Sequence, residues 1–419
     1  MNTSKQHYPL RIAVLVDQFP NLSETFIALQ ISALSTIKGC EIEVFSFGPE
    51  GSWHFLPSGT EAALRRCSIH NMNRSVKRIA KPFRFIKIIK KYPKAFLKYL
   101  IAEKKPTKIN TLVNDLCLIG DLGSFDIAYC QFATIGHNLV TYQDNGFLSE
   151  STKICCAIRG YDISVDSNRY SLQWHRMFQR IEMFLPVCSF FRAELERMGC
   201  ASQIAVCPSP VNTGKLIDSA FSEDPQENSG CLKLLSIGRL VEKKGIDVAL
   251  LACKELKDAG VNFEYHIIGS GPEMEKLQML GRELGLTNQL TFHGQQPSNF
   301  VMDFYRSASL FLAPSRTARN GDSEGIPNVL KEAMLMSVPV VTSDHAGIPE
   351  LVEHEVTGYV CAQNSAAAYF DLLLFAIEGR DDWGHITSLA KEKVLTDYTP
   401  EVCASKLFRN FEKLVHARK

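Results

Sequence analysis

The features that would carry a chain into or across a membrane are missing from this sequence of 419 residues. Its longest apolar run, Tyr369–Ile377, is interrupted by Asp371 and is much shorter than the roughly 18 apolar residues that a bilayer span needs. The first residues lead straight into a strand-like segment, without the apolar region or cleavage site of a secretory signal. We therefore expect a cytoplasmic protein that does not cross a membrane.

Cysteines at metal-ligand spacing are also missing. The thirteen cysteines include no C-x-x-C pair and form no cluster with histidine, and Cys155 and Cys156 lie together in an apolar run. This distribution is typical of buried thiols. It indicates neither a disulfide framework nor a zinc site.

Acidic side chains are nearly missing from one segment, although the net charge of the whole chain is only +1. Arg74–Lys108 carries thirteen Lys or Arg residues and a single acid, Glu103. Apolar residues recur between the cations at near-helical spacing, which predicts basic amphipathic helices broken near Pro82 and Pro93. Such helices could cover a core with a solvated face, or dock on an anionic membrane surface. RNA binding is the third alternative, but no RNA-binding module accompanies the segment, and we expect no nucleic-acid partner.

Apolar strand-like runs alternate with amphipathic stretches along most of the chain, which predicts two doubly wound α/β domains with parallel sheets. A polar linker is expected at Asp218–Gly230, and Ser23 is the expected N-cap of a helix from Thr25 to Leu34. We expect a first domain at residues 1–212 plus 395–419 and a second at 213–394. The expected strands are Leu10–Phe19, Cys40–Gly48, Phe125–Phe132, Lys153–Gly160, Met183–Ser189, Gln203–Val211, Leu232–Leu240, Phe263–Gly271, Leu290–Gly294, Leu310–Arg316, Val338–Asp344 and Thr357–Ala362.

Open α/β sheets bind ligands at the carboxyl ends of their strands, so we expect the site in a cleft between the two domains. The loop Gly238–Gly245 follows a strand of the second domain. It offers Arg239 and Lys244 as cations for a diphosphate, with Gly238 allowing a close backbone approach. Taken alone, such a pair is more often simple surface charge.

A second loop, Ile267–Leu277, follows the next strand and opens a helix whose N-terminus could face an anion. Gly269 and Gly271 resemble half of a dinucleotide fingerprint, but Met274 stands where a third glycine would fall. Contact with a ligand and a tight βα turn are equally good explanations of the two glycines. His293 and Gly294, in the loop Phe292–Pro297, could approach a base.

The segment EGIPNVLKEA, Glu324–Ala333, is the strongest feature. Pro327 suits the first turn of a helix, so Glu324 would precede that helix and the nearby amides would present its positive dipole end. Glu332 would lie two turns into the helix, where it could accept hydrogen bonds from ribose hydroxyls while Glu324 accepts those of a sugar. Simple surface charge is the alternative for both acids. The backbone expected to line this donor site comprises Gly325, Ile326, Pro327, Asn328 and Val329.

The order of these motifs, together with Gly347–Val360, resembles that of the family 4 retaining glycosyltransferases of the GT-B fold. In the first half, Phe19–Ile31, Tyr129–Phe132, Arg159–Ser164 and Val187–Gly199 resemble the branch with colanic acid and amylovoran glycosyltransferases. The resemblance implies two Rossmann-like domains facing across a cleft. It also implies a final helix, about Pro400–Val415, that crosses back to the first domain.

The resemblance also implies roles for single residues. Arg239 and Lys244 would grip the donor diphosphate, Glu332 the ribose, and Glu324 the transferred sugar. Two positions depart from the family pattern, because Arg159 and Gln131 stand where many relatives have histidine. Arg159 would then bind phosphate or an acidic acceptor, or the site would have lost activity. The first-domain loop residues expected to meet the acceptor are Ser23, Glu24, Gln131, Gly160 and Asp162.

The resemblance implies transfer of a hexose from a nucleotide-diphosphate sugar to a growing, lipid-linked surface polysaccharide, with retention of anomeric configuration. No two aspartates are spaced i, i+2, so the Asp-x-Asp metal motif of GT-A enzymes is missing. We expect no metal and no cofactor. The alternatives are a GT-B nucleotide-sugar epimerase or phosphorylase, and a sugar-nucleotide-binding protein without activity.

Overall fold

The computed structural model describes residues 8–416, apart from 22–23, 54–55, 57–58, 72–79, 103–108, 121, 165–170 and 215–229. The chain divides into two compact units. The first comprises Met1–Val187, Arg192–Cys207 and Cys403–Lys419, and the second comprises Cys188–Phe191 and Pro208–Val402. We call them the first and second domains.

The first domain is built on a parallel sheet of seven strands in the order β3-β2-β1-β4-β5-β6-β7. Its central strands β4 and β6 are buried along their whole length, and β1 and β5 are buried except at Arg11 and Lys153, as is usual for parallel sheets covered on both faces. The strands are β1 (Leu10–Val16), β2 (Cys40–Ser46), β3 (Ser68–Asn71), β4 (Ile127–Cys130), β5 (Lys153–Ile158), β6 (Met183–Pro186) and β7 (Gln203–Ile204). The helices are α1 (Thr25–Ser35), α2 (Thr60–Leu64), α3 (Ala80–Lys91), α4 (Pro93–Ala102), α5 (Ile109–Ile119), α6 (Ala133–Asp144), α7 (Tyr161–Ser164), α8 (Ser171–Arg180) and α9 (Ser189–Arg197).

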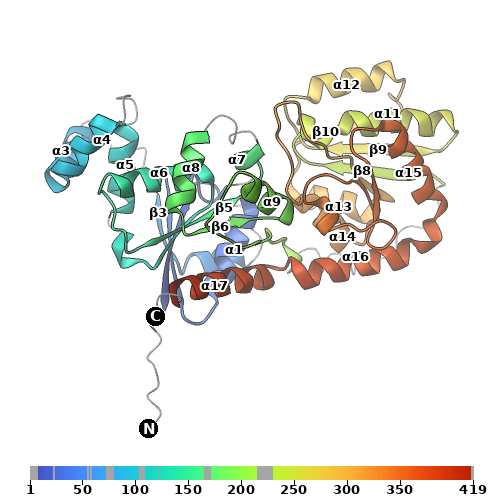
Figure 1. The fold of residues 1–419 in the computed structure, drawn as a ribbon. Helices are drawn as coiled ribbons and strands as arrows, with labels where there is room; N and C mark the ends of the chain where they lie inside the picture. Colours follow the sequence, from blue (N-terminus) through green and yellow to red (C-terminus); the bar gives the residue numbers. More distant parts are fainter. Residues whose placement is uncertain are drawn as a thin grey trace, which may run out of the picture. The chain divides into compact units, whose positions relative to one another are not determined.

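The last helix, α17 (Pro400–His416), completes the first domain (Figure 1). From Cys403 onward its residues belong to that domain, and Leu407 and Phe411 are fully buried in the core below β1 and β4. The ring of Phe411 lies 5.3 Å from that of Tyr129 on β4. The expected return of the final helix is therefore present.

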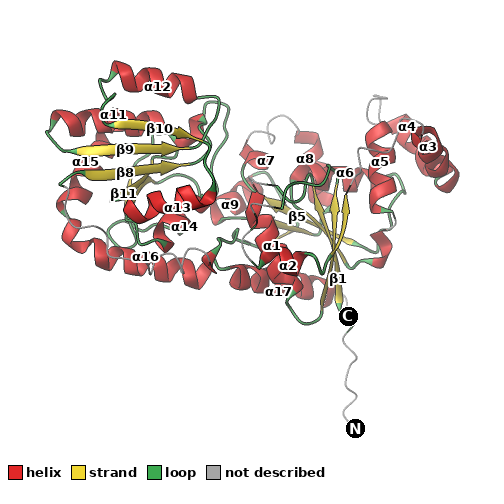
Figure 2. Cartoon of the chain, turned by 180° about the vertical axis from the view of Figure 1, so that it is seen from behind, coloured by secondary structure: helices red, strands yellow, loops and turns green. Residues whose placement is uncertain are grey.

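The second domain has a parallel sheet of six strands in the order β10-β9-β8-β11-β12-β13. Figure 2 shows α11 and α12 on one side of these strands and α13 and α14 on the other, so the sheet is doubly wound. The strands are β8 (Leu232–Ile237), β9 (Phe263–Ile268), β10 (Leu290–Gly294), β11 (Leu310–Ala313), β12 (Val340–Ser343) and β13 (Tyr359–Cys361). The helices are α11 (Ile246–Asp258), α12 (Met274–Glu283), α13 (Ser298–Ser307), α14 (Asn328–Leu335), α15 (Ala366–Glu378) and α16 (Trp383–Asp397).

The two α/β domains agree with the prediction, but some local expectations do not. The domains change at Cys207/Pro208 and Val402/Cys403, because Ser209 and Tyr398 pack around Lys331 of the second domain. The residue that precedes α1 is Glu24, so Ser23 is not the N-cap. Ser23 and most of the expected linker lie outside the described residues, and strand β3 was not expected.

Pro82 lies in the first turn of α3, where its missing N–H is tolerated, so it does not break a helix there. Pro93 does separate α3 from α4. None of the thirteen cysteines forms a disulfide, but Cys117 is exposed, so the prediction that every cysteine is a buried thiol was wrong at this position. Within the described ranges, none of the helices has both the length and the apolar character needed to cross a bilayer.

Candidate functional site

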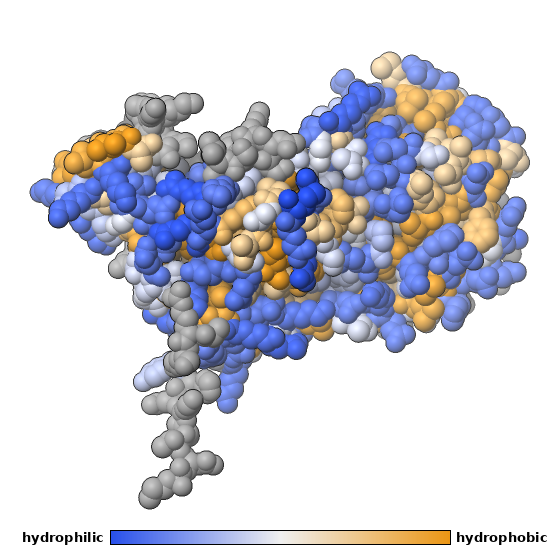
Figure 3. Space-filling model, in the orientation of Figure 1, coloured by the Kyte–Doolittle hydropathy of each residue, from blue (hydrophilic) through white to orange (hydrophobic). Residues whose placement is uncertain are grey.

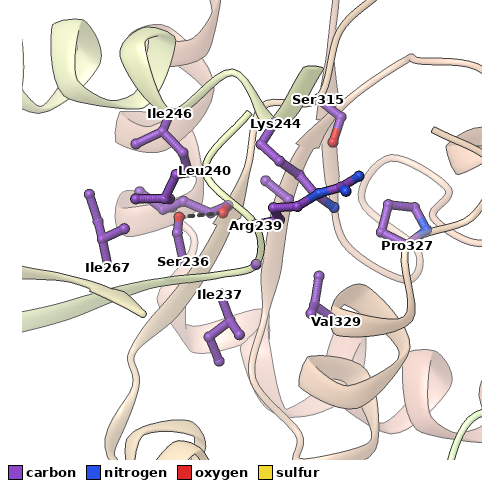
Figure 4. Close-up of a pocket in the computed structure, with 13 residues that line it drawn as sticks. Ser236, Ile237, Arg239, Leu240, Lys244, Ile246, Ile267, Ser315, Pro327 and Val329 are labelled. Atoms are coloured by element: carbon purple, nitrogen blue, oxygen red, sulfur yellow. Dashed lines mark hydrogen bonds between the residues drawn. The ribbon is translucent and has the colours of Figure 1, made fainter. Parts of the chain in front are cut away.

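A pocket in the second domain lies at the carboxyl end of β8, where a parallel sheet is expected to bind its ligand. It encloses about 20 Å³, and its wall includes Gly238, Arg239, Lys244, Pro327 and Val329. Figure 4 shows Arg239 and Lys244 extending toward the side of the pocket formed by Ser315 and Pro327. The prediction that these two cations share one site with the start of α14 therefore fits the geometry.

The two cations differ in their surroundings. Arg239 is exposed, and it forms no ion pair or side-chain hydrogen bond with the part of the chain that the structure describes. Lys244 is mostly buried, and its Nζ lies 3.0 Å from Oε1 of Glu324. Of the two cations, Arg239 is thus the exposed one, whereas Lys244 already neutralises a carboxylate.

The loop with these cations is held in place by the loop that follows β11. Gly245 has a φ of +64°, and a Cβ added there would lie 1.9 Å from the carbonyl oxygen of Pro314, so only glycine fits. The guanidinium of Arg316 bonds to Asp247 at 2.9 Å and to the carbonyl oxygen of Glu242 at 3.1 Å. These contacts fix the backbone that presents Lys244.

The glycines of the second loop have a structural explanation. A Cβ on Gly269 would lie 1.8 Å from the carbonyl oxygen of Gly238, and one on Gly271 would lie 2.3 Å from that of Leu240. The loops after β8 and β9 therefore pass each other at backbone contact, and Leu240 N donates to Ser270 O at 2.9 Å. The tight-turn explanation of Gly269 and Gly271 accounts for them without a ligand.

Glu324 precedes α14, as expected, and is buried among cations. Besides Lys244, the Nζ of Lys243 lies 3.8 Å from its carboxylate. Burial raises the pKa of Glu324, but Lys244 and Lys243 lower it by more, so its pKa falls below the usual value and the side chain stays ionised. Lys243 is itself buried and bonds to Asp322 at 3.0 Å. The sequence reasoning selected Lys244 and missed Lys243.

Helix α14 begins at Asn328, with Pro327 as the N-cap residue and not in the first turn. Its N-terminus has no side-chain cap, and Val329 in its first turn lines the pocket, so the positive end of the helix dipole lies beside the pocket. Gly325 and Ile326 form the turn before it. Leu330, Ala333 and Met334 are fully buried, as expected for the core stripe.

Glu332 lies one turn into α14 beyond the pocket residue Val329. Its carboxylate accepts a hydrogen bond of 3.1 Å from the hydroxyl of Tyr305, which also lies 3.2 Å from the carbonyl oxygen of Val329. Burial raises the pKa of Glu332, and the Tyr305 hydrogen bond partly offsets this. Tyr305 thus orients Glu332; the sequence offered no signal for it, because it comes from the distant helix α13.

His293 lies at the end of β10 and packs in an aromatic group. Its Nε2 lies 3.1 Å from Nδ1 of His266, and its ring centroid lies 4.6 Å from that of Phe304. Burial lowers the pKa of both histidines. Gly294 accepts a backbone hydrogen bond from Gly269, which joins this loop to the one after β9.

In the first domain, Arg159 and Gln131 bond directly to each other. Arg159 donates through Nη2 to Oε1 of Gln131 and through Nε to the carbonyl oxygen of Gln131, the latter at 3.2 Å. Its guanidinium lies 4.5 Å from the ring centroid of Phe26. The two residues that depart from the family pattern therefore contact each other, at the carboxyl ends of β4 and β5.

Two acids complete this group. Asp162 accepts from the amides of Ala133 and Arg159 at 3.1 Å and 3.2 Å, which holds the β4 and β5 loops together. Burial raises the pKa of Glu24, and Arg159 opposes that rise. Gly160 has a φ of +120°, a conformation that favours glycine. The structure thus gathers Glu24, Gln131, Gly160 and Asp162 around Arg159.

Among the residues that the structure describes, no three His, Cys, Asp or Glu side chains are arranged to hold a metal ion.

The sequence is similar to known glycosyltransferases. The family model described as "Glycosyl transferases group 1" matches residues 218–392. The chain is 30% identical over 413 residues to the putative colanic acid biosynthesis glycosyltransferase WcaL of Escherichia coli, covering 95% of this chain and 98% of that protein. The chain belongs to the group 1 glycosyltransferases.

Two further similarities place this glycosyltransferase among its relatives. The amylovoran biosynthesis glycosyltransferase AmsK of Erwinia amylovora is 32% identical over 292 residues, which is 66% of this chain and 70% of that protein. The Anabaena protein Alr3699/HepE in complex with UDP-glucose aligns with a TM-score of 0.65 at 14% identity, over 96% of this chain and 99% of that one. At that identity the likeness shows the fold alone. The expected GT-B fold and the resemblance to these glycosyltransferases are confirmed.

Proposed function

We propose that this glycosyltransferase moves a hexose from a nucleotide-diphosphate sugar to a growing surface polysaccharide, with retention of anomeric configuration. The observation that carries the proposal is the pocket where Arg239, Lys244 and the uncapped start of α14 meet. A diphosphate leaving group develops negative charge as its bond to the sugar breaks. Cations and a helix N-terminus stabilise such charge.

The two carboxylates would bind different parts of the donor. Glu332 would accept hydrogen bonds from the ribose hydroxyls, since Tyr305 fixes one of its oxygens and a carboxylate has further acceptor capacity. Glu324 would accept from hydroxyls of the transferred sugar beside the anomeric carbon. In the resting pocket Glu324 shares Lys244, and an incoming diphosphate would compete for that ammonium.

The acceptor would meet the first domain at the group around Arg159. A guanidinium is a planar, charged donor group, which suits an acceptor with phosphate or carboxylate oxygens. The similarity to WcaL and AmsK supports a polysaccharide acceptor, because the names of both proteins place them in exopolysaccharide biosynthesis.

A lipid-linked acceptor would bring the enzyme to the inner face of the cytoplasmic membrane. The described residues of α3 and α4 contain no acid, and both helices expose apolar side chains between lysines (Figure 3). The exposed apolar residues on these helices are Ile86, Leu97, Leu100 and Ile101. Lysines that meet anionic headgroups and apolar side chains that enter the interface are the features of a peripheral membrane helix.

The proposal is tested by a panel of UDP-, GDP-, ADP- and TDP-sugars, screened first by thermal stabilisation and then by NMR of the products. A bound donor raises the melting temperature by mass action. We expect one nucleotide class to stabilise the protein and its sugar to appear in the product with unchanged anomeric configuration. Inverted product would contradict retention, and stabilisation without transfer or donor hydrolysis would favour a binding protein without activity.

We expect transfer to need no divalent metal. Turnover in excess EDTA should equal turnover in buffer, because the cations of the pocket take the place of a metal at the diphosphate. Loss of turnover in EDTA and its recovery with manganese would contradict this prediction. The matched control is the same titration on a metal-dependent glycosyltransferase.

A further inference from the structure

The backbone of Glu324 is held by a side chain that the sequence reasoning did not select. His345 follows β12, at the same carboxyl edge of the sheet as the pocket, and its side chain is 1% exposed. Its Nε2 lies 3.1 Å from the amide nitrogen of Glu324. Its Nδ1 lies 3.2 Å from Oε1 of Gln363. The imidazole therefore links the Glu324 peptide to a residue that follows β13.

The contacts at both ends determine which ring nitrogen carries the proton. The amide of Thr317 lies 3.2 Å from the same atom of Gln363 that faces Nδ1. A backbone amide can only donate, so this atom is the amide oxygen, and Nδ1 must donate to it. The amide of Glu324 also can only donate, so Nε2 must accept. The arrangement is satisfied by the neutral Nδ1–H tautomer alone.

We propose that His345 is a positioning residue for transfer: its neutral imidazole, fixed by Gln363, holds the Glu324 peptide and so places the Glu324 carboxylate in the pocket. This inference rests on the proposed role of Glu324 at the transferred sugar. His345 touches neither donor nor acceptor in this account and acts through Glu324.

A proton on Nε2 would disrupt the arrangement, since two N–H groups would then face each other. Three charged groups face His345 from neighbouring elements: Glu324 before α14, Lys243 after β8 and Asp344 after β12. Burial is the largest influence and lowers the pKa of His345 below its usual 6.5, although Glu324 opposes this. His345 is thus neutral above pH 6.5, and the neutral form is lost as the pH falls through the lowered pKa. Glu324 itself stays ionised, and the raised pKa of Glu332 would add an acid limit of its own, so the part of the acid limit that H345Q removes reports His345.

The tautomer can be tested without any substrate. In protein labelled with ¹⁵N-histidine, the long-range ¹H–¹⁵N spectrum distinguishes the two neutral tautomers and the imidazolium, and the signals missing from H345Q identify His345. We expect the Nδ1–H tautomer at pH 7.5. An Nε2–H tautomer or a protonated ring at that pH would overturn the proposal.

The positioning role is tested by the pH profile of transfer or donor hydrolysis, with UDP-glucose or, if it is inactive, the panel sugar that is turned over. H345L removes the acceptor and should lower kcat by roughly tenfold to a hundredfold, with KM changed far less. H345Q supplies an amide oxygen in place of Nε2, so it should restore most of kcat. It should also lose the part of the acid limit, expected in the wild type below pH 6.5, that protonation of His345 causes.

A second variant moves the pH limit without removing the contact. Q363E keeps an acceptor for Nδ1 and for Thr317 but adds a negative charge that favours the imidazolium. The acid limit should move upward by roughly one pH unit or more. H385Q, at an exposed histidine of α16, is the control and should leave the profile unchanged.

The outcomes separate this inference from the proposed function. If E324Q abolishes turnover while H345L retains full kcat, or if H345Q and Q363E both keep the wild-type acid limit, the positioning role is wrong and the proposed function stands. If no sugar of the panel is turned over by the wild type, the proposed function fails and the positioning role fails with it, whichever tautomer the NMR spectrum shows.

Discussion

Glu324 and Lys244 lie 3.0 Å apart, and both side chains are largely buried. A buried charge that loses its partner costs about 3–5 kcal/mol, so K244M would reduce stability as well as donor binding. Loss of activity in that variant alone would not separate the two effects. Variants that keep every buried charge paired are more informative about the donor site.

Tyr305 offers such a variant. Y305F removes one hydroxyl, which leaves the Glu332 carboxylate less restrained and raises its pKa further, since the Tyr305 hydrogen bond now lowers it. We expect several-fold weaker binding of UDP or the corresponding nucleoside diphosphate by calorimetry, with a larger loss at lower pH. The domain should lose about 1 kcal/mol of stability.

The matched control for Y305F is Y369F, which deletes another buried hydroxyl of the second domain, bonded to Val341 at 2.7 Å. It should lower stability by a similar amount and leave nucleotide affinity unchanged. Equal losses of affinity in both variants would show that Tyr305 acts only through the fold.

Sequence spacing predicted that Glu324, Glu332 and Lys244 belong to one site, but not the partners that hold them. Lys243 and Lys244 are adjacent in the sequence, and nothing in their order shows which of them turns toward Asp322. Tyr305 and His345 reach the site from α13 and from the end of β12. Of these partners, only His345 had a signal in the sequence: it is a polar residue directly after an apolar strand, where a parallel sheet is expected to bind its ligand.

At the scale of helices and strands, apolar runs predicted most of the sheets because the strands are buried on both faces. The missed strand, β3, has no fully buried residue and lies at the edge of its sheet, so it lacks the apolar run that identifies the others. Helix α14 was predicted from its Gly-Ile-Pro start and its core stripe. A buried lysine within that stripe, Lys331, could not be predicted from periodicity, which assigns charged residues to the solvent face.

Lys331 allows a prediction about α14. Its side chain is 0% exposed, and its Nζ donates to Ser209 O at 2.7 Å and to Asn328 Oδ1 at 3.0 Å, over the ring of Tyr398. K331M leaves both oxygens without this donor and should cost about 1–3 kcal/mol. For a domain of this size that corresponds to a melting temperature lower by roughly 2–4 °C per kcal/mol.

Differential scanning calorimetry of K331M measures this loss. The control is K276M on α12, where the lysine is exposed and the change should stay within about 0.5 kcal/mol. A K331M melting temperature equal to that of the wild type would show that the buried ammonium contributes nothing to α14.

At the scale of the whole molecule, the near-neutral net charge conceals the basic helices α3 and α4. Sedimentation with anionic liposomes tests their role. Replacing Lys87, Lys90, Lys91 and Lys94 by glutamate should lower the bound fraction more than tenfold, at about 1 kcal/mol per lysine. The double variant L97S/I101S should also lower the bound fraction, although it leaves the net charge unchanged.

L251S, at an exposed leucine of α11, is the control for the apolar pair and should bind as the wild type does. If both helix variants bind liposomes as tightly as the wild type, the helices only cover the core of their domain. If the wild type binds RNA and does not bind liposomes, the helices bind nucleic acid and not a membrane surface.

The most direct test of the whole account is calorimetric titration of UDP-glucose, or the panel sugar that stabilises the protein, into the wild type, R239A and R282A. Arg239 is exposed and unpaired within the described residues, so its removal disturbs the fold little, and a charge-assisted contact to the diphosphate is worth about 1.5–3 kcal/mol. The account predicts at least tenfold weaker binding by R239A and unchanged binding by R282A, an exposed arginine of α12. Wild-type affinity in R239A would contradict it.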